Sequence, residues 1–199
     1  MYYRQRQPML ASPHLSILRN RAMRRPGADL SSLEGVVAPT ILEALRVASK
    51  RLSGLGIRHA LVGGLAVGAH GFPRATKDIN FLVGDEAFEH HEGGIITMKA
   101  GVPIQIGGVL VDLLSAQPED GALRDIPVTS AGEEVPVAPV EALVHLKLKS
   151  PRMKDASDVI ELLKAGIDQA RCRAWLQANA SALLPRFEEL VERAEKENE

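Results

Sequence analysis

Two segments of the sequence place acidic or amide side chains among apolar residues. Asp78 and Asn80 stand two residues apart in a stretch that alternates polar and apolar residues, and Asp112 interrupts the apolar run 109–114. Because side chains alternate between the two faces of a strand, Asp78 and Asn80 share one face, and Asp112 joins them if its strand lies alongside. A buried carboxylate must be paired or bind a metal ion. Two or three hard oxygen ligands on adjacent strands predict a Mg²⁺ site, since Mg²⁺ prefers carboxylates, water and substrate phosphates.

A pair of glycines upstream complements these ligands. Gly63 and Gly64 end the short apolar run 59–62 and precede a short helix. Glycine lets the backbone approach a ligand closely and a helix N-terminus attracts anions, so this turn suits the phosphates of a nucleoside triphosphate. The alternative is an ordinary tight turn. A metal site beside a phosphate site predicts phosphoryl or nucleotidyl transfer.

Hydrophobic spacing indicates the elements that must position these residues. The expected strands cover residues 59–62, 76–83, 95–99, 102–106 and 109–114. The expected helices cover residues 37–55, 65–70, 140–149, 154–165, 170–178 and 183–199. A polar loop at 118–121 and extended chain over 128–139 separate the two groups. We therefore expect an α+β fold, with a mixed β-sheet flanked by helices and a helical annex at the C-terminus.

The charge distribution separates a basic N-terminal segment from the rest of the chain. Residues 1–25 contain six arginines and no Asp or Glu, so the remaining residues carry a net charge of −7 although the whole chain carries −1. Such an arm suits a polyanion, and the alternative is a terminus without a function. We expect three parts, namely a basic arm over 1–35, a sheet-containing core over 36–135 and a helical region over 136–199.

Composition excludes several classes of protein. The chain has 199 residues, of which 45% are hydrophobic and 25% charged, and this is typical of a globular protein rather than a disordered one. No stretch reaches the roughly 18 consecutive apolar residues of a membrane-spanning helix. The single cysteine, Cys172, excludes an internal disulfide and a multi-cysteine zinc site. We therefore expect a cytoplasmic protein with no membrane segment.

Three motifs, in this order and spacing, resemble the signature of the nucleotidyltransferase superfamily with the DNA polymerase β-like fold. They are the Gly-Gly turn at 63–64, the Asp-x-Asn pair at 78–80 and the later aspartate at 112. Within the superfamily, the most similar groups are the small bacterial AbiEii-type toxins, the minimal nucleotidyltransferases and the antibiotic-adenylylating enzymes. The segment 146–159 also resembles the helical part of AbiEii-like proteins, where a lysine and an Arg/Lys-Asp pair face the nucleotide.

The resemblance implies a role for each matching residue. Asp78, Asn80 and Asp112 take the positions of the Mg²⁺ ligands, and the family uses the residue at the third position also to activate the attacking hydroxyl. The turn 63–64 would hold the phosphates of the NTP. The candidates for contacting the triphosphate are Lys147, Arg74 and Lys77.

Asn80 departs from the family pattern, which has a carboxylate that bridges two metal ions at this position. Asparagine offers one carbonyl oxygen and no charge, so a pair of metals loses a ligand and several kcal/mol of transition-state stabilisation. Three explanations are open: a slow or one-metal enzyme, an NTP-binding protein without activity, or a variant inactivated to trap a substrate.

The predicted function is Mg²⁺-dependent transfer of NMP from an NTP to an acceptor hydroxyl. The resemblance implies a toxin–antitoxin or phage-defence setting, with tRNA as an acceptor and a cognate antitoxin protein as a partner. Two alternatives are open. One is adenylylation of a small hydroxylated molecule such as an antibiotic, and the other is an NTP-binding interaction module, which the Asn80 substitution would suit.

Some polar residues have plainer interpretations as well. Lys147 lies on an amphipathic helix and would ordinarily face solvent, while Asp155 and Asp158 would most simply cap the following helix at its positive end. His70 ends a short helix, and the run 90–92 of two histidines and a glutamate is expected to form a loop rather than a metal site.

Overall fold

The structure is a computed structural model that describes residues 27–88, 103–116, 118–128 and 135–198. Its strands are β1 (His59–Val62), β2 (Asp78–Val83), β3 (Ile104–Ile106) and β4 (Val109–Ser115). Its α-helices are α2 (Pro39–Gly54), α3 (Gly63–Ala69), α4 (Val140–Lys149), α5 (Met153–Lys164), α6 (Gln169–Asn179) and α7 (Leu184–Lys196). Short 3-10 turns are η2 (Leu30–Leu33), η3 (Asp85–Phe88), η4 (Pro118–Asp125) and η5 (Ser181–Leu183).

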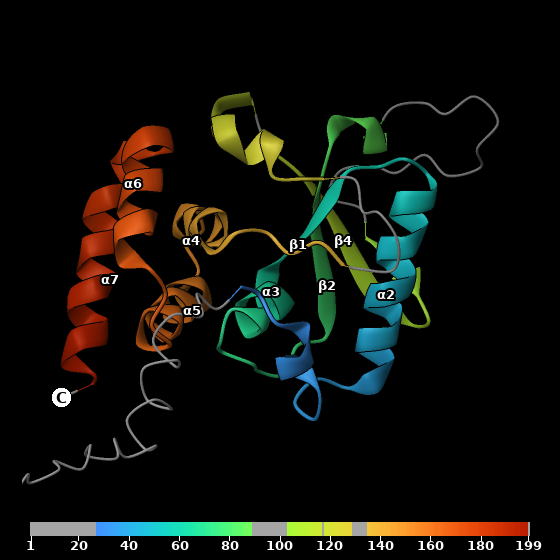
Figure 1. Ribbon diagram of the computed structural model, residues 1–199, viewed down its shortest axis with the longest axis horizontal. Helices are drawn as coiled ribbons and strands as arrows, with labels where there is room; N and C mark the ends of the chain where they lie inside the picture. Colours follow the sequence, from blue (N-terminus) through green and yellow to red (C-terminus); the bar gives the residue numbers. More distant parts are fainter. Residues whose placement is uncertain (1–26, 89–102, 117, 129–134, 199) are drawn as a thin grey trace, which may run out of the picture.

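The four described strands form one mixed sheet in the order β1-β2-β4-β3. The central pair β2 and β4 is parallel, and each is flanked by an antiparallel strand, β1 beside β2 and β3 beside β4. Helices flank the sheet and four of them follow it in the chain (Figure 1). The predicted α+β class, with a mixed sheet and C-terminal helices, is confirmed.

Alternation along the two central strands separates a core face from a polar face. Ile79 and Phe81 of β2 and Val111 and Leu113 of β4 are at most 2% exposed and belong to the main hydrophobic core. Helix α2 packs on this face, and its Ser49 Oγ lies 2.8 Å from Nε2 of a buried histidine in β1. The core face thus fixes the register, because a slip by one residue would turn every apolar side chain to the other face.

The C-terminal helices form a layer beside the sheet. In Figure 1, α4 and α5 lie between the sheet and the outer helices α6 and α7. The extended chain before α4 runs along β1, where Leu61 pairs with Val137. His70, at the end of α3 as expected, lies with Nε2 2.8 Å from the Ala138 carbonyl oxygen and so ties α3 to this segment.

Most predicted elements are confirmed, and the differences are local. Helix α3 begins two residues earlier than predicted, at Gly63 itself, and the expected polar loop at 118–121 forms part of η4. The end of the predicted basic arm is ordered against the core, since Leu33 of η2 is completely buried. The arm residues 1–25, the predicted strand 95–99 and the run 90–92 lie outside the described residues.

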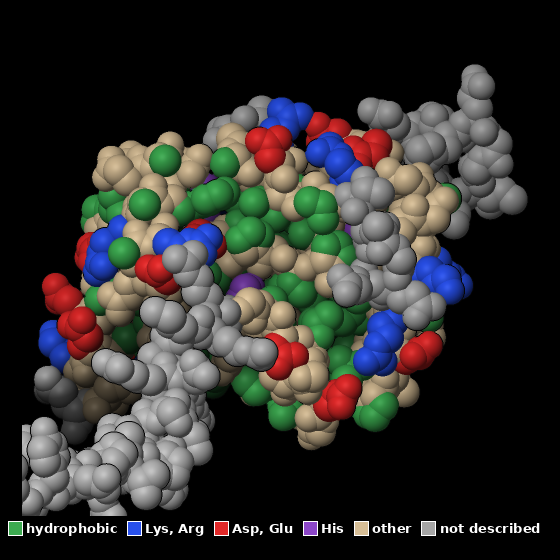
Figure 2. Space-filling view, viewed as in Figure 1, with side chains coloured by type: hydrophobic (Ala, Val, Ile, Leu, Met, Phe, Trp, Pro, Cys, Tyr) green, Lys and Arg blue, Asp and Glu red, His purple; other side chains and the backbone are tan. Residues whose placement is uncertain are grey.

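One face of the molecule shows how the side chains are distributed. In Figure 2, hydrophobic side chains gather over the middle of the face, and charged side chains surround them, including those over α2 at the right. Over the described part of the chain, every helix is too short or too polar to cross a bilayer.

Candidate active site

The strand register brings the three predicted ligands together. Asn80 of β2 lies directly opposite Asp112 of β4 in the parallel pair, and Asp78 lies two residues before Asn80 on the same face. All three side chains are partly buried and line one pocket of about 150 Å³. The residues that line it are Gly63, Gly64, Arg74, Thr76, Asp78, Asn80, Asp112, Lys147, Arg152, Lys154 and Asp155. The pocket therefore unites residues from the sheet, the glycine turn and helices α4 and α5.

Asp78 is held by two neutral donors. The Thr76 hydroxyl donates to Oδ1 at 2.9 Å, and the Asn80 amide nitrogen donates to Oδ2 at 3.0 Å. Burial alone would raise the pKa of Asp78, but these hydrogen bonds and the nearby Lys154 ammonium outweigh it, so the pKa lies below its usual value. Asp78 is therefore an anion at neutral pH, with lone pairs left on both oxygens for a further ligand.

The glycine turn lies directly against these side chains. Gly63 has φ +70°, a conformation that favours glycine, and a Cβ added there would stand 3.0 Å from Nδ2 of Asn80. A Cβ on Gly64 would stand 3.2 Å from Oγ1 of Thr76 and 3.3 Å from the Arg74 guanidinium. A side chain at either glycine would press on the polar side chains of this face, and at Gly63 the positive φ adds backbone strain, so the turn lies close over the polar face of β2.

Two buried aspartates of α5 hold three cations at one side of the pocket. Asp158, 3% exposed, accepts both Nε and a terminal nitrogen of Arg74 at 2.9 Å, and also Nζ of Lys147 at 2.7 Å. Asp155, 2% exposed, accepts Lys147 at 2.5 Å and Nε of Arg152 at 2.7 Å. The cations come from the loop before β2, from α4 and from the start of α5, so the network fastens the helical region to the sheet.

The network strongly favours ionised Asp155. Burial raises the pKa of this carboxyl, but the hydrogen bond from Lys147 and those from its other neighbours lower it to about 2. Three cations and two carboxylates leave one net positive charge beside Asp78 and Asp112. This charge suits an anionic group such as a phosphate placed between the network and the strands.

The ligand set fits one hard cation better than two. Two carboxylates, Asp78 and Asp112, and the amide of Asn80 are the kind of oxygen donors with which proteins hold Mg²⁺ together with substrate phosphates. The Asn80 nitrogen already donates to Asp78, so only its carbonyl oxygen is left to bind a metal. Within the described ranges, no group of three acidic, histidine or cysteine side chains is placed to hold a metal. The residues fit a single Mg²⁺ and do not fit a carboxylate-bridged pair.

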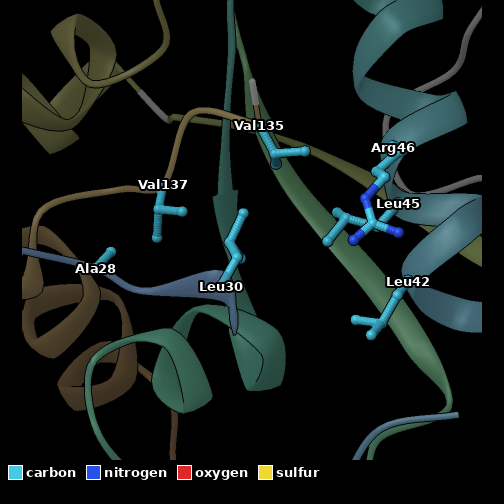
Figure 3. Close-up of a pocket in the computed structure, with 7 residues that line it drawn as sticks. All are labelled: Ala28, Leu30, Leu42, Leu45, Arg46, Val135 and Val137. Atoms are coloured by element: carbon cyan, nitrogen blue, oxygen red, sulfur yellow. The ribbon is translucent and has the colours of Figure 1, made fainter. Parts of the chain in front are cut away.

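A second cleft, of about 370 Å³, lacks side chains that could bind a metal or transfer a proton. Figure 3 shows it between Leu42, Leu45 and Arg46 of α2, the segment before α2, and Val135 and Val137 of the extended chain. Its lining side chains are apolar apart from the Arg46 guanidinium, and it shares no residue with the pocket around Asp78. This cleft therefore offers no side chain for acid–base catalysis or metal binding.

Comparisons with known proteins give a distant likeness only. No family model matches the sequence, and no curated protein matches it. A solved structure of an antigenic nucleotidyltransferase-like protein from Paracoccidioides brasiliensis is similar at a TM-score of 0.46 and 14% identity, over 80% of this chain and 94% of that chain. This likeness assigns no function to the chain.

The pocket includes seven of the eight residues singled out in the sequence. Gly63, Gly64, Arg74, Asp78, Asn80, Asp112 and Lys147 line it. Lys77 is exposed and is not among the lining residues. The plainer interpretation, that Lys147 faces solvent, is wrong. The Lys147 side chain is 9% exposed and binds both aspartates of α5.

Neither aspartate caps α5, although Asp155 does lie in the first turn, near the positive end of the helix, as the plainer interpretation held. The N-cap of α5 is Arg152, which makes no side-chain cap hydrogen bond, and Asp155 and Asp158 point to cations instead. Their spacing of three residues places them on one face of the helix, and this spacing is the feature of the sequence that could have indicated a shared role. The sequence interpretation also gave Thr76 no role, although its position two residues before Asp78 puts both on one face of an extended chain.

Proposed function

We propose that the protein transfers a nucleoside monophosphate from an NTP to an acceptor hydroxyl. The observation that carries the proposal is the register of β2 and β4, which sets Asn80 opposite Asp112 and beside Asp78, under a glycine turn and next to a cationic network. Oxygen ligands on one side and cations on the other are what a metal-bound triphosphate requires.

In the proposed reaction the acceptor oxygen attacks the α-phosphorus of the NTP. A new bond forms between this oxygen and phosphorus, and the bond from phosphorus to the bridging oxygen of the β-phosphate breaks. Pyrophosphate leaves with the electron pair of that bond. The hydroxyl proton passes to the Asp112 carboxylate, which acts as the general base.

The cations of the network have the complementary role. Arg74, Lys147 and Arg152 line the pocket, and the proposal assigns them to the leaving pyrophosphate, whose charge increases as the bond breaks. The turn at Gly63 and Gly64 allows the triphosphate to approach the backbone closely.

A bound Mg²⁺, held by Asp78 and Asp112 with the Asn80 carbonyl oxygen, would neutralise phosphate charge and orient the triphosphate. Because Asn80 removes one negative charge relative to the superfamily pattern, we expect a slower reaction than a three-carboxylate site supports. Asp78 and Asp112 keep the charge needed for one cation.

The biological setting is part of the proposal. The resemblance of segments 62–80 and 146–159 to AbiEii-type toxins supports a toxin–antitoxin or phage-defence role, with a tRNA end as acceptor and an antitoxin as partner. The six arginines of residues 1–25 would attract RNA phosphates. Deletion of these residues should weaken RNA affinity at low salt, and unchanged affinity would remove the arm from the proposal.

One observation favours a second candidate function. The Asn80 amide donates to Asp78, so this carboxylate is stabilised without a metal. The alternative function is an NTP-binding module that senses nucleotides or pairs with a partner without catalysing transfer.

The decisive experiment incubates the protein with each labelled NTP, Mg²⁺ and total RNA. The native chain is compared with Asp112→Asn, which removes the base but keeps the shape, and with Asn80→Asp. Labelled RNA with the native chain, and a loss of at least about a hundredfold in Asp112→Asn, is the expected result for loss of a general base.

Two other outcomes have different meanings. Labelling only by Asn80→Asp would identify the native protein as the binding module. Equal labelling by the native chain and Asp112→Asn would show that this carboxylate is not the base.

A further inference from the structure

Each oxygen of the Asp78 carboxylate accepts a hydrogen bond from a neutral side chain. The Thr76 hydroxyl lies 2.9 Å from Oδ1, and the Asn80 amide nitrogen lies 3.0 Å from Oδ2. The cations Arg74 and Lys147, which line the same pocket, are bonded to the aspartates of α5. The direction of the Asp78 carboxylate is therefore fixed by two groups that do not neutralise its charge.

A carboxylate that binds a metal benefits from both properties. It attracts a hard cation through its charge, and a positively charged partner would compete with the metal for the same oxygens. A hydrogen bond that fixes its direction in advance strengthens binding, because less conformational freedom is lost when the metal arrives. The neutral donors around Asp78 are therefore suited to hold it ready for a cation.

The Thr76 side chain is confined between the carboxylate and the glycine turn. It is partly buried, and a Cβ added to Gly64 would stand 3.2 Å from its Oγ1. The hydroxyl has a single hydrogen, and this hydrogen is donated to Asp78. Because a β-branched side chain has few χ1 rotamers, threonine holds this donor more firmly than an unbranched residue would. Thr76 is thus a rigid support on one oxygen of Asp78.

We propose that Thr76 is a positioning residue of the site, whose hydroxyl orients the Asp78 carboxylate in the pocket that Asp112 also lines and thereby raises the affinity for Mg²⁺. This inference rests on the proposed function and adds to it a residue to which the sequence interpretation gave no role. Thr76 binds neither the metal nor the nucleotide, and it acts through Asp78 alone.

The test compares Thr76→Val, which replaces the hydroxyl by a methyl group of similar size, with Thr76→Ser, which keeps the hydroxyl. Thr76→Ala removes the hydroxyl without adding a methyl group, in case valine packs poorly. The matched control is Thr40→Val, at an exposed position in the first turn of α2. Thermal unfolding confirms that each variant folds. Binding of Mn²⁺, which takes the same oxygen ligands as Mg²⁺, is measured by electron paramagnetic resonance with and without a non-hydrolysable NTP analogue.

We expect Thr76→Val and Thr76→Ala to raise the Kd for Mn²⁺ about tenfold, the lower end of the range for loss of a partner of a metal ligand, because Asn80 still holds Oδ2. Thr76→Ser should stay within about threefold of the native Kd, and Thr40→Val within about twofold. In metal-free buffer the affinity for the NTP analogue should change less than about twofold in every variant. Transfer by Thr76→Val should reach its half-maximal rate at about tenfold higher Mg²⁺, an effect that a merely structural role would not produce.

An unchanged Kd for Mn²⁺ in Thr76→Val and Thr76→Ala would overturn the positioning role and leave the proposed function intact. A loss in Thr76→Ser as large as that in Thr76→Val would also overturn it, because the hydroxyl would then not be what matters. Loss of affinity for the analogue in metal-free buffer would identify Thr76 as a direct phosphate contact instead. A native chain that binds no Mn²⁺, alone or with the analogue, would overturn the metal site of the proposed function, and the positioning role with it.

Discussion

Two arginine–carboxylate pairs of similar geometry differ in burial, and they allow a direct test of the network. Arg74 binds Asp158 through two bonds of 2.9 Å, and Arg173 binds Glu188 through two bonds of 2.7 and 2.9 Å. The side chains of the first pair are 18% and 3% exposed, whereas those of the second are 41% and 44% exposed. We compare Asp158→Asn with Glu188→Gln.

The expected losses of folding stability follow from how far each ion pair is exposed to water. In Asp158→Asn, Arg74 loses its charged partner and Lys147 keeps only Asp155, so a buried positive charge is left incompletely paired. Removal of one partner from a buried pair costs about 3–5 kcal/mol, and we expect about 3 kcal/mol because Arg74 retains some contact with water. In Glu188→Gln both partners were already solvated, so the loss should stay below about 1 kcal/mol.

The free energy of unfolding is measured by urea titration, and the melting temperature by calorimetry. For a chain of this length about 3 kcal/mol corresponds to about 6–12 °C. Affinity for an NTP should also fall in Asp158→Asn, because Arg74 and Lys147 line the pocket, and stay unchanged in Glu188→Gln. Equal destabilisation by the two substitutions, or loss of stability with NTP affinity unchanged, would refute the role assigned to Asp158.

Three further predictions follow from local geometry. Gly63→Ala should abolish NTP binding, and it should lower the free energy of unfolding more than Gly35→Ala does. Both glycines have a positive φ, but of the two only Gly63 has a close neighbour. Equal losses of free energy in urea titration would contradict this prediction. Burial, partly offset by backbone hydrogen bonds, lowers the pKa of His59 and His70. The stability that these two histidines contribute is therefore complete above pH 6.5 and is lost as the pH falls through their folded-state pKa values. A melting temperature that does not fall below pH 6.5 would contradict this prediction. The pKa of Asp155, lowered to about 2, predicts a stabilisation that persists above pH 3.8 and disappears as the pH falls toward 2, and Asp155→Asn should remove that acid transition from the melting curve.

Local patterns in the sequence were enough to predict most of the elements. The alternation in β2 and the helical spacing of α4 depend on which face of each element is buried, and neighbouring residues record this directly. The prediction that Asp112 joins Asp78 and Asn80 was conditional on strand order. The parallel pairing of β2 and β4 satisfies that condition.

Long-range pairing could not be predicted in the same way. Arg74 and Asp158 are 84 residues apart, and nothing near either residue in the chain indicates the other. A buried lysine such as Lys147 looks like a solvent-facing lysine in an amphipathic pattern, because the pattern does not show which carboxylates a neighbouring helix will supply. Charges that pair across elements are fixed by packing, and packing is not a local property of the sequence.

Asn80 is the residue for which stability and catalysis make opposite demands. Its amide donates to Asp78 and its backbone lies opposite Asp112, so Asn80→Asp would replace a hydrogen bond by repulsion between three carboxylates. Without a metal we expect this variant to lose about 1–4 kcal/mol, the range for unit charges 4 Å apart between water and an effective dielectric of 20. Mg²⁺ should restore more stability to Asn80→Asp than to the native chain, since a cation relieves the repulsion only where it exists. A melting temperature that Mg²⁺ raises equally in both proteins would show that the position does not face the metal, and the proposed placement of the cation between Asp78 and Asp112 would then be wrong.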